Sequence, residues 1–258
     1  MKLKILICAL LFSFASFVDA EEIKTYSGSF HDFSGVYMLY PKATYQYYEA
    51  EDLTRIYHGP FSMTFTGDGS TNQRKRVGSL KGNFKNGKFD GQWTLVYPTM
   101  EYKYTGRKNL KILYTITVKI NFVDGEIDGP VEVVVSNSAN KVLTKTVMNY
   151  SNGIREGEFS YSWPQTNRAI PEIEEVKGQY HNGAPVGKWT YQYGLNKGIA
   201  DYDNDLNYMI DYRTGAKKDG ISLDLYKLSY PGISFAKLMN VFGAITPSTS
   251  ESFPEIWY

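Results

Sequence analysis

The histidines are the first residues whose chemistry could define a site. The chain has three, His31, His58 and His181, and none has a cysteine or a second histidine nearby in the sequence. Zinc sites usually gather imidazole and thiolate ligands at short spacings. His181 also lies beside an Asn-Gly pair, where an exposed side chain is ordinary. We therefore predict no metal site at these residues.

Three alternating aspartates, Asp201, Asp203 and Asp205, match the first ligand positions of an EF-hand calcium loop. That loop needs glycine at its sixth position and glutamate at its twelfth, where this chain has Leu206 and Tyr212. The segment is therefore predicted to be a solvated loop between repeats rather than a tight calcium site.

Two further charged clusters have ordinary explanations. Glu172, Glu174 and Glu175 form a carboxylate cluster on a predicted strand or loop without strongly apolar surroundings, and the basic run at 74–76 is predicted to be a solvated loop. The chain also lacks a Gly-x-Ser-x-Gly elbow, a phosphate-binding loop and a His-Glu-x-x-His motif. We predict a protein that is not an enzyme and binds no cofactor.

The amino-terminal segment has the organisation of a signal peptide. Lys2 and Lys4 precede an apolar run from Ile5 to Phe17, and a cleavage site fits after Ala20. The run is too short to span a bilayer comfortably as an anchor. Residues 1–20 are therefore predicted to be removed, and the mature protein is predicted to be exported, either periplasmic or extracellular.

Cleavage would also remove the one cysteine, Cys8, and with it any disulfide or thiolate chemistry. The whole chain has 28 basic and 27 acidic residues, so the loss of Lys2, Lys4 and Asp19 leaves 26 of each. A net charge of zero gives no general attraction to nucleic acid or to anionic lipid. We predict no nucleic-acid partner, and charge does not indicate membrane association.

A recurring motif organises residues 21–226. Its clearest copy, at 84–97, reads aromatic, one residue, Asn-Gly, three residues, Gly, one residue, Trp, and then alternating apolar residues. Four later copies follow, and Gly35 and Gly59 mark two degenerate earlier ones, which makes about seven units. The predicted structural repeat positions are Phe84, Gly87, Gly91, Trp93, Gly125, Gly129, Tyr150, Gly153, Gly157, Phe159, Tyr180, Gly183, Gly187, Trp189, Tyr212 and Gly215.

Each copy is predicted to form a β-hairpin. Asn-Gly and Asp-Gly supply the positive φ of a tight turn, and the second glycine either lies beneath an aromatic ring or has positive φ itself. Trp93, Leu95 and Tyr97 then alternate onto one face, and Pro98 is expected to end the strand. With 22 tyrosines and 14 phenylalanines, the composition favours strands. The predicted fold is all-β, an elongated antiparallel meander of stacked hairpins.

This motif resembles the MORN repeat, and more closely the variant MORN repeats of bacterial proteins, some of which are loosely described as antitoxin-like. The resemblance covers about residues 28–226. The chain departs from the family in its longer spacing and in its degenerate first two copies. MORN proteins are mostly scaffolds for protein association, some are linked to membrane lipids, and they share no active site. The resemblance thus implies an architecture and a scaffolding role.

Residues 227–258 break the repeat pattern and are predicted to form a capping helix and a tail. Ser234 can serve as the N-cap of this helix. We expect the helix to cover the free end of the sheet, although a partner-binding helix is the alternative. Its apolar stripe has the i, i+3, i+4, i+7 spacing of Phe235, Leu238, Met239 and Phe242.

We predict a non-enzymatic scaffold that binds another protein. The sequence specifies neither the identity of this partner nor the oligomeric state. Trp93, Phe159 and Trp189 occupy one equivalent position of the repeat and are predicted to be core. Partner contacts are therefore expected at the exposed hairpin tips. The candidate contact residues are Lys88, Asp90, Arg155 and Glu156.

Two alternatives stay open. An outer-membrane β-barrel would explain the alternating strands and the terminal Tyr258, although the apolar stretches are shorter than the roughly 9–11 residues of a spanning strand. A carbohydrate-binding surface would instead use exposed Trp93, Trp163 and Trp189 as stacking platforms.

Overall fold

The computed structural model describes residues 22–30, 38–67, 76–104, 106, 109–163, 173–221, 223, 229–230, 233–243 and 245. Several sequence predictions lie outside these residues. They concern the signal peptide, His31, Gly35, Arg74, Lys75, Glu172 and the tail after Ile245.

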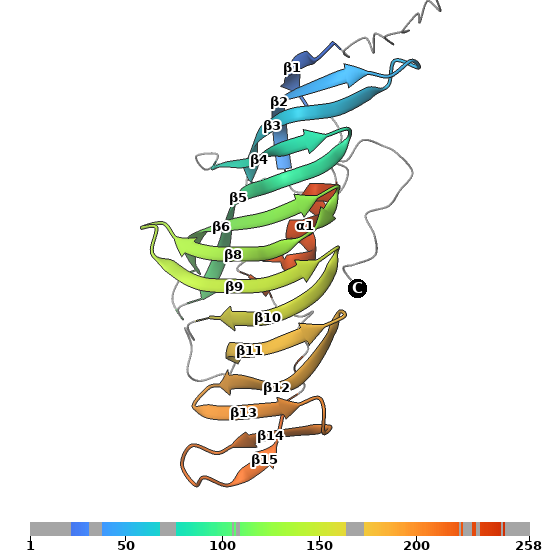
Figure 1. Ribbon diagram of the computed structural model, residues 1–258. Coiled ribbons are helices and arrows are strands. Elements are labelled where there is room, and N and C mark those ends of the chain that lie inside the picture. Colours follow the sequence, from blue (N-terminus) through green and yellow to red (C-terminus); the bar gives the residue numbers. More distant parts are fainter. Residues whose placement is uncertain are drawn as a thin grey trace, which may run out of the picture.

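Fifteen antiparallel strands form one sheet in which the strands follow each other in chain order (Figure 1). Strand β7 (Glu126–Ile127) alone lies off this path and pairs with β6. The sheet is open, because its first and last strands each pair with one neighbour among the described strands. The predicted all-β antiparallel meander is confirmed. The other strands of the sheet are β1 (Lys24–Ser29), β2 (Met38–Glu49), β3 (Arg55–Gly67), β4 (Val77–Lys85), β5 (Lys88–Tyr104), β6 (Asn109–Val123), β8 (Gly129–Asn137), β9 (Val142–Ser151), β10 (Ile154–Ser162), β11 (Ile173–His181), β12 (Ala184–Tyr193), β13 (Asn196–Asp201), β14 (Leu206–Ile210) and β15 (Lys217–Asp219).

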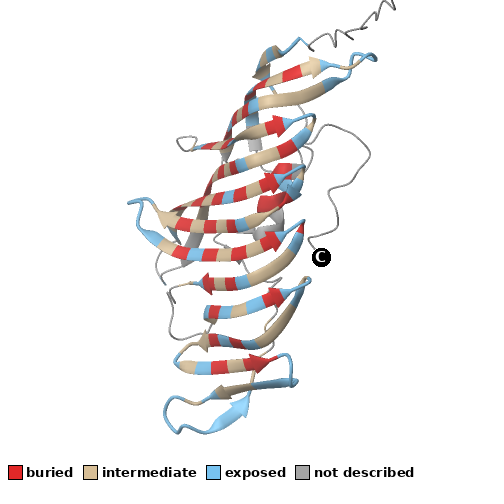
Figure 2. Ribbon diagram, in the orientation of Figure 1, coloured by how far each residue is buried: buried red, intermediate tan, exposed pale blue. Residues whose placement is uncertain are grey.

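The alternation in the sequence becomes two different faces of the sheet. In β6, Ile116, Val118 and Ile120 are buried, whereas Thr117 is half-buried and Lys119 is exposed. The same banding of buried and accessible positions recurs from strand to strand in Figure 2. We call the side with the buried residues the aromatic face and the opposite side the outer face.

The hairpins share one turn and one irregularity. The first turn residues Asn86, Asp124, Asn152 and Asn182 have φ between 48° and 50°, and glycines at positive φ follow them, as predicted. Beyond the turn, the pairing between the two strands shifts by two residues at a bulge. A shift of two keeps the later side chains on the same face, whereas a shift of one would reverse them.

The second glycine of the motif lies in this bulge, and the structure decides between its two predicted explanations. Gly91 and Gly187 have φ of 65°, and a Cβ there would meet no atom within 4 Å. Positive φ, rather than a neighbouring ring, therefore requires these glycines. The close approach occurs at Gly82 and Gly178, where a Cβ would lie 2.0 Å from the indole of the tryptophan on the next strand.

The expected strand end at Pro98 is wrong, because Pro98 lies within β5, which continues to Tyr104. Beyond Val96, β5 pairs with β6 alone. This part of β5 is therefore an edge, where a missing backbone N–H is tolerated.

The expected position of the last repeat aromatic is also wrong. Tyr212 is not a ladder aromatic, because it lies in the loop before β15 and is 51% exposed. That loop runs from 211 to 216, so the last hairpin has no two-residue turn at Thr214-Gly215, although Gly215 does have φ of 69°.

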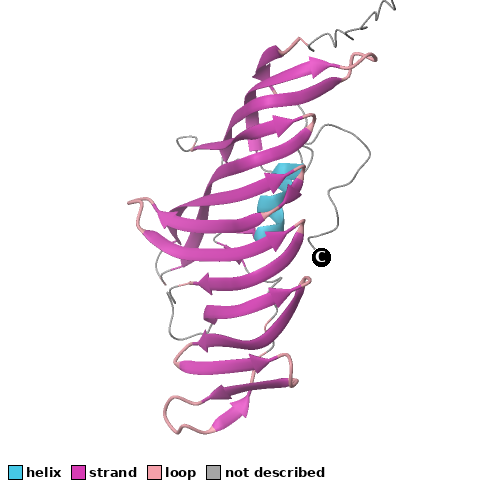
Figure 3. Ribbon diagram, viewed as in Figure 1, coloured by secondary structure: helices cyan, strands magenta, loops and turns pink. Residues whose placement is uncertain are grey.

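The helix α1 (Phe235–Gly243) begins directly after Ser234, as predicted, but its expected position at the end of the sheet is wrong. The Phe242 ring lies 6.1–6.4 Å from the rings of Phe89, Trp93 and Phe122 in the middle of the aromatic face. Large rings there need cover, whereas the three residues of β15 are all exposed and polar. Figure 3 shows this one helix against the sheet, and a small pair of strands, β16 (Ser229–Tyr230) and β17 (Ile233–Ser234), precedes it.

Candidate interaction surfaces

The tight turns form a hydrogen-bonded column along one edge of the sheet, which we call the tip column (turns 86–87, 124–125, 152–153 and 182–183). The N–H of each turn glycine donates to a carbonyl just beyond the previous turn, at N···O distances of 2.7–3.0 Å. Gly153 donates to Ile127 and Gly183 donates to Arg155, for example. Consecutive hairpins are therefore joined at their tips as well as along their strands.

The predicted contact residues lie on this column, but some are engaged within it. Glu156 accepts from the backbone N–H of Asn182 at 2.8 Å and contacts His181 Nδ1 at 2.9 Å, and both interactions lower the pKa of Glu156. The Arg155 guanidinium lies 5.3 Å from the centre of the Tyr180 ring. These two side chains connect neighbouring hairpins. The structure places Lys88 at an exposed tip position and leaves Asp90 half-buried beside it.

Both described histidines also belong to this column. His58 Nδ1 lies 3.0 Å from Asn86 Oδ1, just as His181 lies against Glu156 at a later tip. Their role is therefore to join consecutive hairpins. Among the described residues, no three His, Cys, Asp or Glu side chains gather in a way that could hold a metal ion.

Two of the three alternating aspartates accept hydrogen bonds from nearby backbone and amide groups. Asp203 Oδ1 accepts the N–H of Gly187 at 2.9 Å, and Asp201 accepts the N–H and the side-chain amide of Asn204 at 3.3 and 3.0 Å. Asp201 is also 5% exposed. These carboxylates stabilise the turn between β13 and β14 and attach it to the neighbouring hairpin.

The basic run has a structural role at the one residue that is described. Arg76 donates to the carbonyls of Thr99 and Tyr114 at 3.0 and 2.6 Å and to the Thr115 hydroxyl at 2.8 Å. The predicted solvated side chain is therefore wrong for Arg76, which links β5 to β6. In the acidic cluster, Glu175 forms an ion pair with Lys177 at 2.6 Å.

The aromatic face is not available to a ligand at its tryptophans. Trp93 and Trp189 are 0% exposed and Phe159 is 4% exposed, which confirms that this equivalent position is core. Trp163 is half-buried against the same cluster. Trp93 and Trp189 are therefore not exposed platforms on which a sugar could stack.

One repeated position, an amide residue, was not among the sequence predictions. An amide residue precedes the aromatic residue of each hairpin in the tip column, and in two of these hairpins it hydrogen-bonds across the bulge. Asn121 and Asn149 donate to the carbonyls of Asp128 and Glu158 at 3.0 Å. The signal is visible in the sequence as an amide directly before each ring, at Asn83, Asn121, Asn149 and Gln179.

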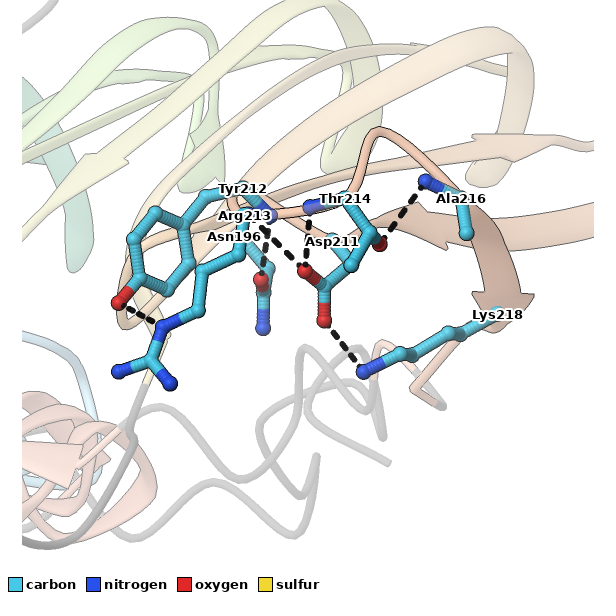
Figure 4. Close-up of polar contacts among 7 residues, drawn as sticks. All are labelled: Asn196, Asp211, Tyr212, Arg213, Thr214, Ala216 and Lys218. Atoms are coloured by element: carbon cyan, nitrogen blue, oxygen red, sulfur yellow. Dashed lines mark hydrogen bonds and ion pairs between the residues drawn. The ribbon is translucent and has the colours of Figure 1, made fainter.

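The terminal hairpin carries a separate polar network (Figure 4). The Asp211 carboxylate accepts the N–H groups of Arg213 and Thr214 at 2.9 and 3.1 Å and contacts the Lys218 ammonium. These donors hold the pKa of Asp211 well below its usual range, with the Lys218 hydrogen bond as the largest cause. The network shapes the loop between β14 and β15 and lies apart from the tip column.

The outer face carries lysines at a regular interval. Strand pairing traces two adjacent rows of residues across this face, from β2 to β15. In these rows, every second strand along the sheet contributes one exposed lysine. We call this set the lysine array. Its members are Lys42, Lys81, Lys119, Lys145, Lys177, Lys197 and Lys217.

The amino-terminal end of the array lies at a hollow of about 430 Å³ on the first three strands. Hydroxyl side chains dominate its lining, and Ser27 and Thr44 are hydrogen-bonded to each other at 2.9 Å. Lys42 is the charged residue of this lining. The other hydroxyl residues of the hollow are Ser29, Ser62 and Thr64.

Comparison with known proteins finds no matching family model, no similar curated protein and no similar solved structure. In the part of the chain that the structure describes, no helix is long and apolar enough to cross a membrane. The resemblance to MORN repeats therefore stays a prediction.

Proposed function

We propose that this protein is an exported, non-enzymatic, MORN-like scaffold that binds another protein along its tip column. The proposal rests on the difference between the packed aromatic face and the accessible hairpin tips. Rings pack the aromatic face and α1 covers its middle, whereas the tips stay accessible and repeat from hairpin to hairpin. A long column of equivalent positions suits a scaffold, which needs an extended surface rather than a cavity.

The tip contacts support this proposal because they make the column rigid. Each turn is hydrogen-bonded to the previous one, so tip side chains are presented at a fixed interval. A preorganised surface loses little conformational entropy when it binds. Lys88 is the tip residue best suited to a partner, because its side chain is exposed while its stem lies beside Gly125.

The open sheet supports the scaffold over the membrane alternative. A sheet that spans a membrane has to close on itself, since free edges leave backbone groups unpaired in lipid. The described first and last strands do not pair with each other. Export itself rests on the signal-peptide pattern of residues 1–20.

Affinity capture with the mature chain, residues 21–258, tests the proposal in the exported fraction of the source cells. Lys88→Glu reverses one tip charge, and Lys141→Glu is the matched control, an exposed lysine in the β8–β9 connection on the opposite edge. We expect Lys88→Glu to reduce recovery of the partner severalfold and Lys141→Glu to leave it unchanged. Equal recovery with both variants would contradict binding at the tips.

A further inference from the structure

We propose that the lysine array binds an acidic polysaccharide, a sugar polymer with one carboxylate on about every second sugar, laid across the strands of the outer face. This inference goes beyond the proposed function, because it concerns a different surface and a different class of partner. It also differs from a sugar stacked on tryptophans, since the outer-face contacts are ammonium groups and hydroxyls.

The spacing of the array fits a polymer. Neighbouring strands lie about 4.8 Å apart, so lysines on every second strand recur about every 9–10 Å along the sheet. All seven are exposed and lie in two adjacent rows. A small ligand would meet one lysine, whereas a linear chain crossing the strands can meet them in succession. A polysaccharide with a carboxylate on alternate sugars repeats its charge at a comparable interval.

Hydroxyl residues lie between the lysines, most densely at the amino-terminal end. Around Lys42 and Lys81, the two rows contain serine and threonine and no acidic residue from β2 to β4. Each hydroxyl can donate and accept, which matches the hydroxyl groups of a sugar. The 430 Å³ hollow opens at this end. These strands therefore offer cations for carboxylates and hydroxyls for the rings between them.

The array becomes weaker toward the middle of the sheet. Glu132 forms ion pairs with Lys119 at 3.7 Å and with Lys145 at 2.6 Å, and the Lys145 hydrogen bond is the main reason why its pKa is lowered. Lys177 is paired with Glu175. A ligand carboxylate would have to compete with these acids. We therefore assign the strongest contacts to Lys42 and Lys81, which lie on the hydroxyl-rich strands.

The same rows disfavour a nucleic acid. One strand of a duplex carries a charge about every 3.4 Å, so most of its phosphates would face no lysine of the array. Single-stranded nucleic acid also binds by stacking its bases on aromatic rings. Among the described residues of the two rows, the one aromatic is Tyr208, and the Lys217 ammonium lies 4.3 Å from its ring centre.

Binding of labelled hyaluronan oligosaccharides to the mature chain at low salt tests the inference, because hyaluronan carries one carboxylate per disaccharide. The double variant Lys42→Gln/Lys81→Gln removes the two strongest cations. Its matched control, Lys88→Gln/Lys141→Gln, removes two exposed lysines outside the array. Exposed ion pairs are individually weak, so we expect the array variant to raise the Kd about fivefold and the control to change it less than twofold.

Further measurements test whether the array variant is folded and whether another ligand binds better. We expect the array variant to keep the parental melting temperature, and we expect higher salt to weaken hyaluronan binding by the parent. No binding by the parent, or equal loss in the array variant and the control, would overturn the inference. Tighter binding of a thymidine oligonucleotide than of hyaluronan would also overturn it. Capture of a protein partner through Lys88 is a separate readout, so either proposal can fail alone.

Discussion

The central hairpins, from β4 to β12, and the terminal hairpin, β14–β15, are closed and stabilised in different ways. A central hairpin closes with a two-residue turn, carries a bulge glycine and buries a ring, as in Trp189 at 0% exposure. The terminal hairpin closes with the loop at 211–216, and its last strand has three residues, all exposed. The central hairpins are therefore held by packing and by neighbouring tips, and the terminal one by a local polar network.

This difference shows what each repeat must supply to be part of the core. In the β4–β5 and β11–β12 hairpins, a glycine on one strand makes room for the tryptophan of the next, as Gly178 does for Trp189. In the terminal hairpin, no Asn-Gly or Asp-Gly turn is present, and the Asp211 carboxylate holds the loop by accepting hydrogen bonds from the N–H groups of Arg213 and Thr214. Polar contacts of that kind are exposed and contribute little stability, so most of the unfolding free energy should reside in the central hairpins.

The largest expected effect compares a ring from each region. Trp189→Ala should lower the free energy of unfolding by about 3–5 kcal/mol, because it removes a fully buried side chain and leaves a cavity. Tyr212→Ala should change it by less than about 0.5 kcal/mol, since that ring is 51% exposed in the loop. Urea denaturation followed by circular dichroism measures both. Similar losses in the two variants would remove the distinction between the regions.

A second comparison uses glycines that are required for different reasons. Gly178→Ala should cost about 1–3 kcal/mol, because its Cβ would lie 2.0 Å from the buried Trp189 indole, which has no room to move. Gly215→Ala in the terminal loop should cost about 1 kcal/mol from its positive φ alone, since open space surrounds it. Thermal melts rank the two. A smaller loss at Gly178 would show that the ring does not pack where the structure has it.

The smallest expected effect is a pH dependence of the tip column. The contact with His181 and the N–H of Asn182 lower the pKa of Glu156 from its ordinary value of 4.5. A lowered carboxyl pKa stabilises the fold above about pH 4.5, and this contribution is lost as the pH falls through the folded-state pKa. The melting temperature of the parent should therefore fall on acidification more than that of Glu156→Gln. Parallel curves for the two proteins would refute a contribution from this tip contact.

Much of the fold could be predicted because it depends on local rules. Period-two alternation defined the buried face, and Asn-Gly and Asp-Gly pairs defined the tight turns, for example at Asn152. The last hairpin was misread, since Thr214-Gly215 resembles a turn pair, whereas the side chain of Asp211 organises a longer loop. The position of α1 was also misread, because a stripe of apolar residues defines a helix but not the surface that it covers.

The candidate surfaces could be predicted only in part, because they depend on strand register. Arg155 and Glu156 were expected at the tips, but their contacts with the next hairpin follow from how turns stack. The lysine array is invisible in the sequence, where Lys42 and Lys81 are separated by almost forty residues. The array appears only when the two-residue bulge shifts are counted, since they decide which residues face each other across strands.

Acrylamide quenching of tryptophan fluorescence tests most directly the central claim that the aromatic face is core. The variant Trp163→Phe/Trp257→Phe retains Trp93 and Trp189, which are both 0% exposed. In the native state, we expect weak quenching and a blue-shifted emission maximum, both of which are lost together when the protein unfolds in urea. Strong quenching of the native variant would instead place these rings on an open recognition surface and show that the aromatic face is not core.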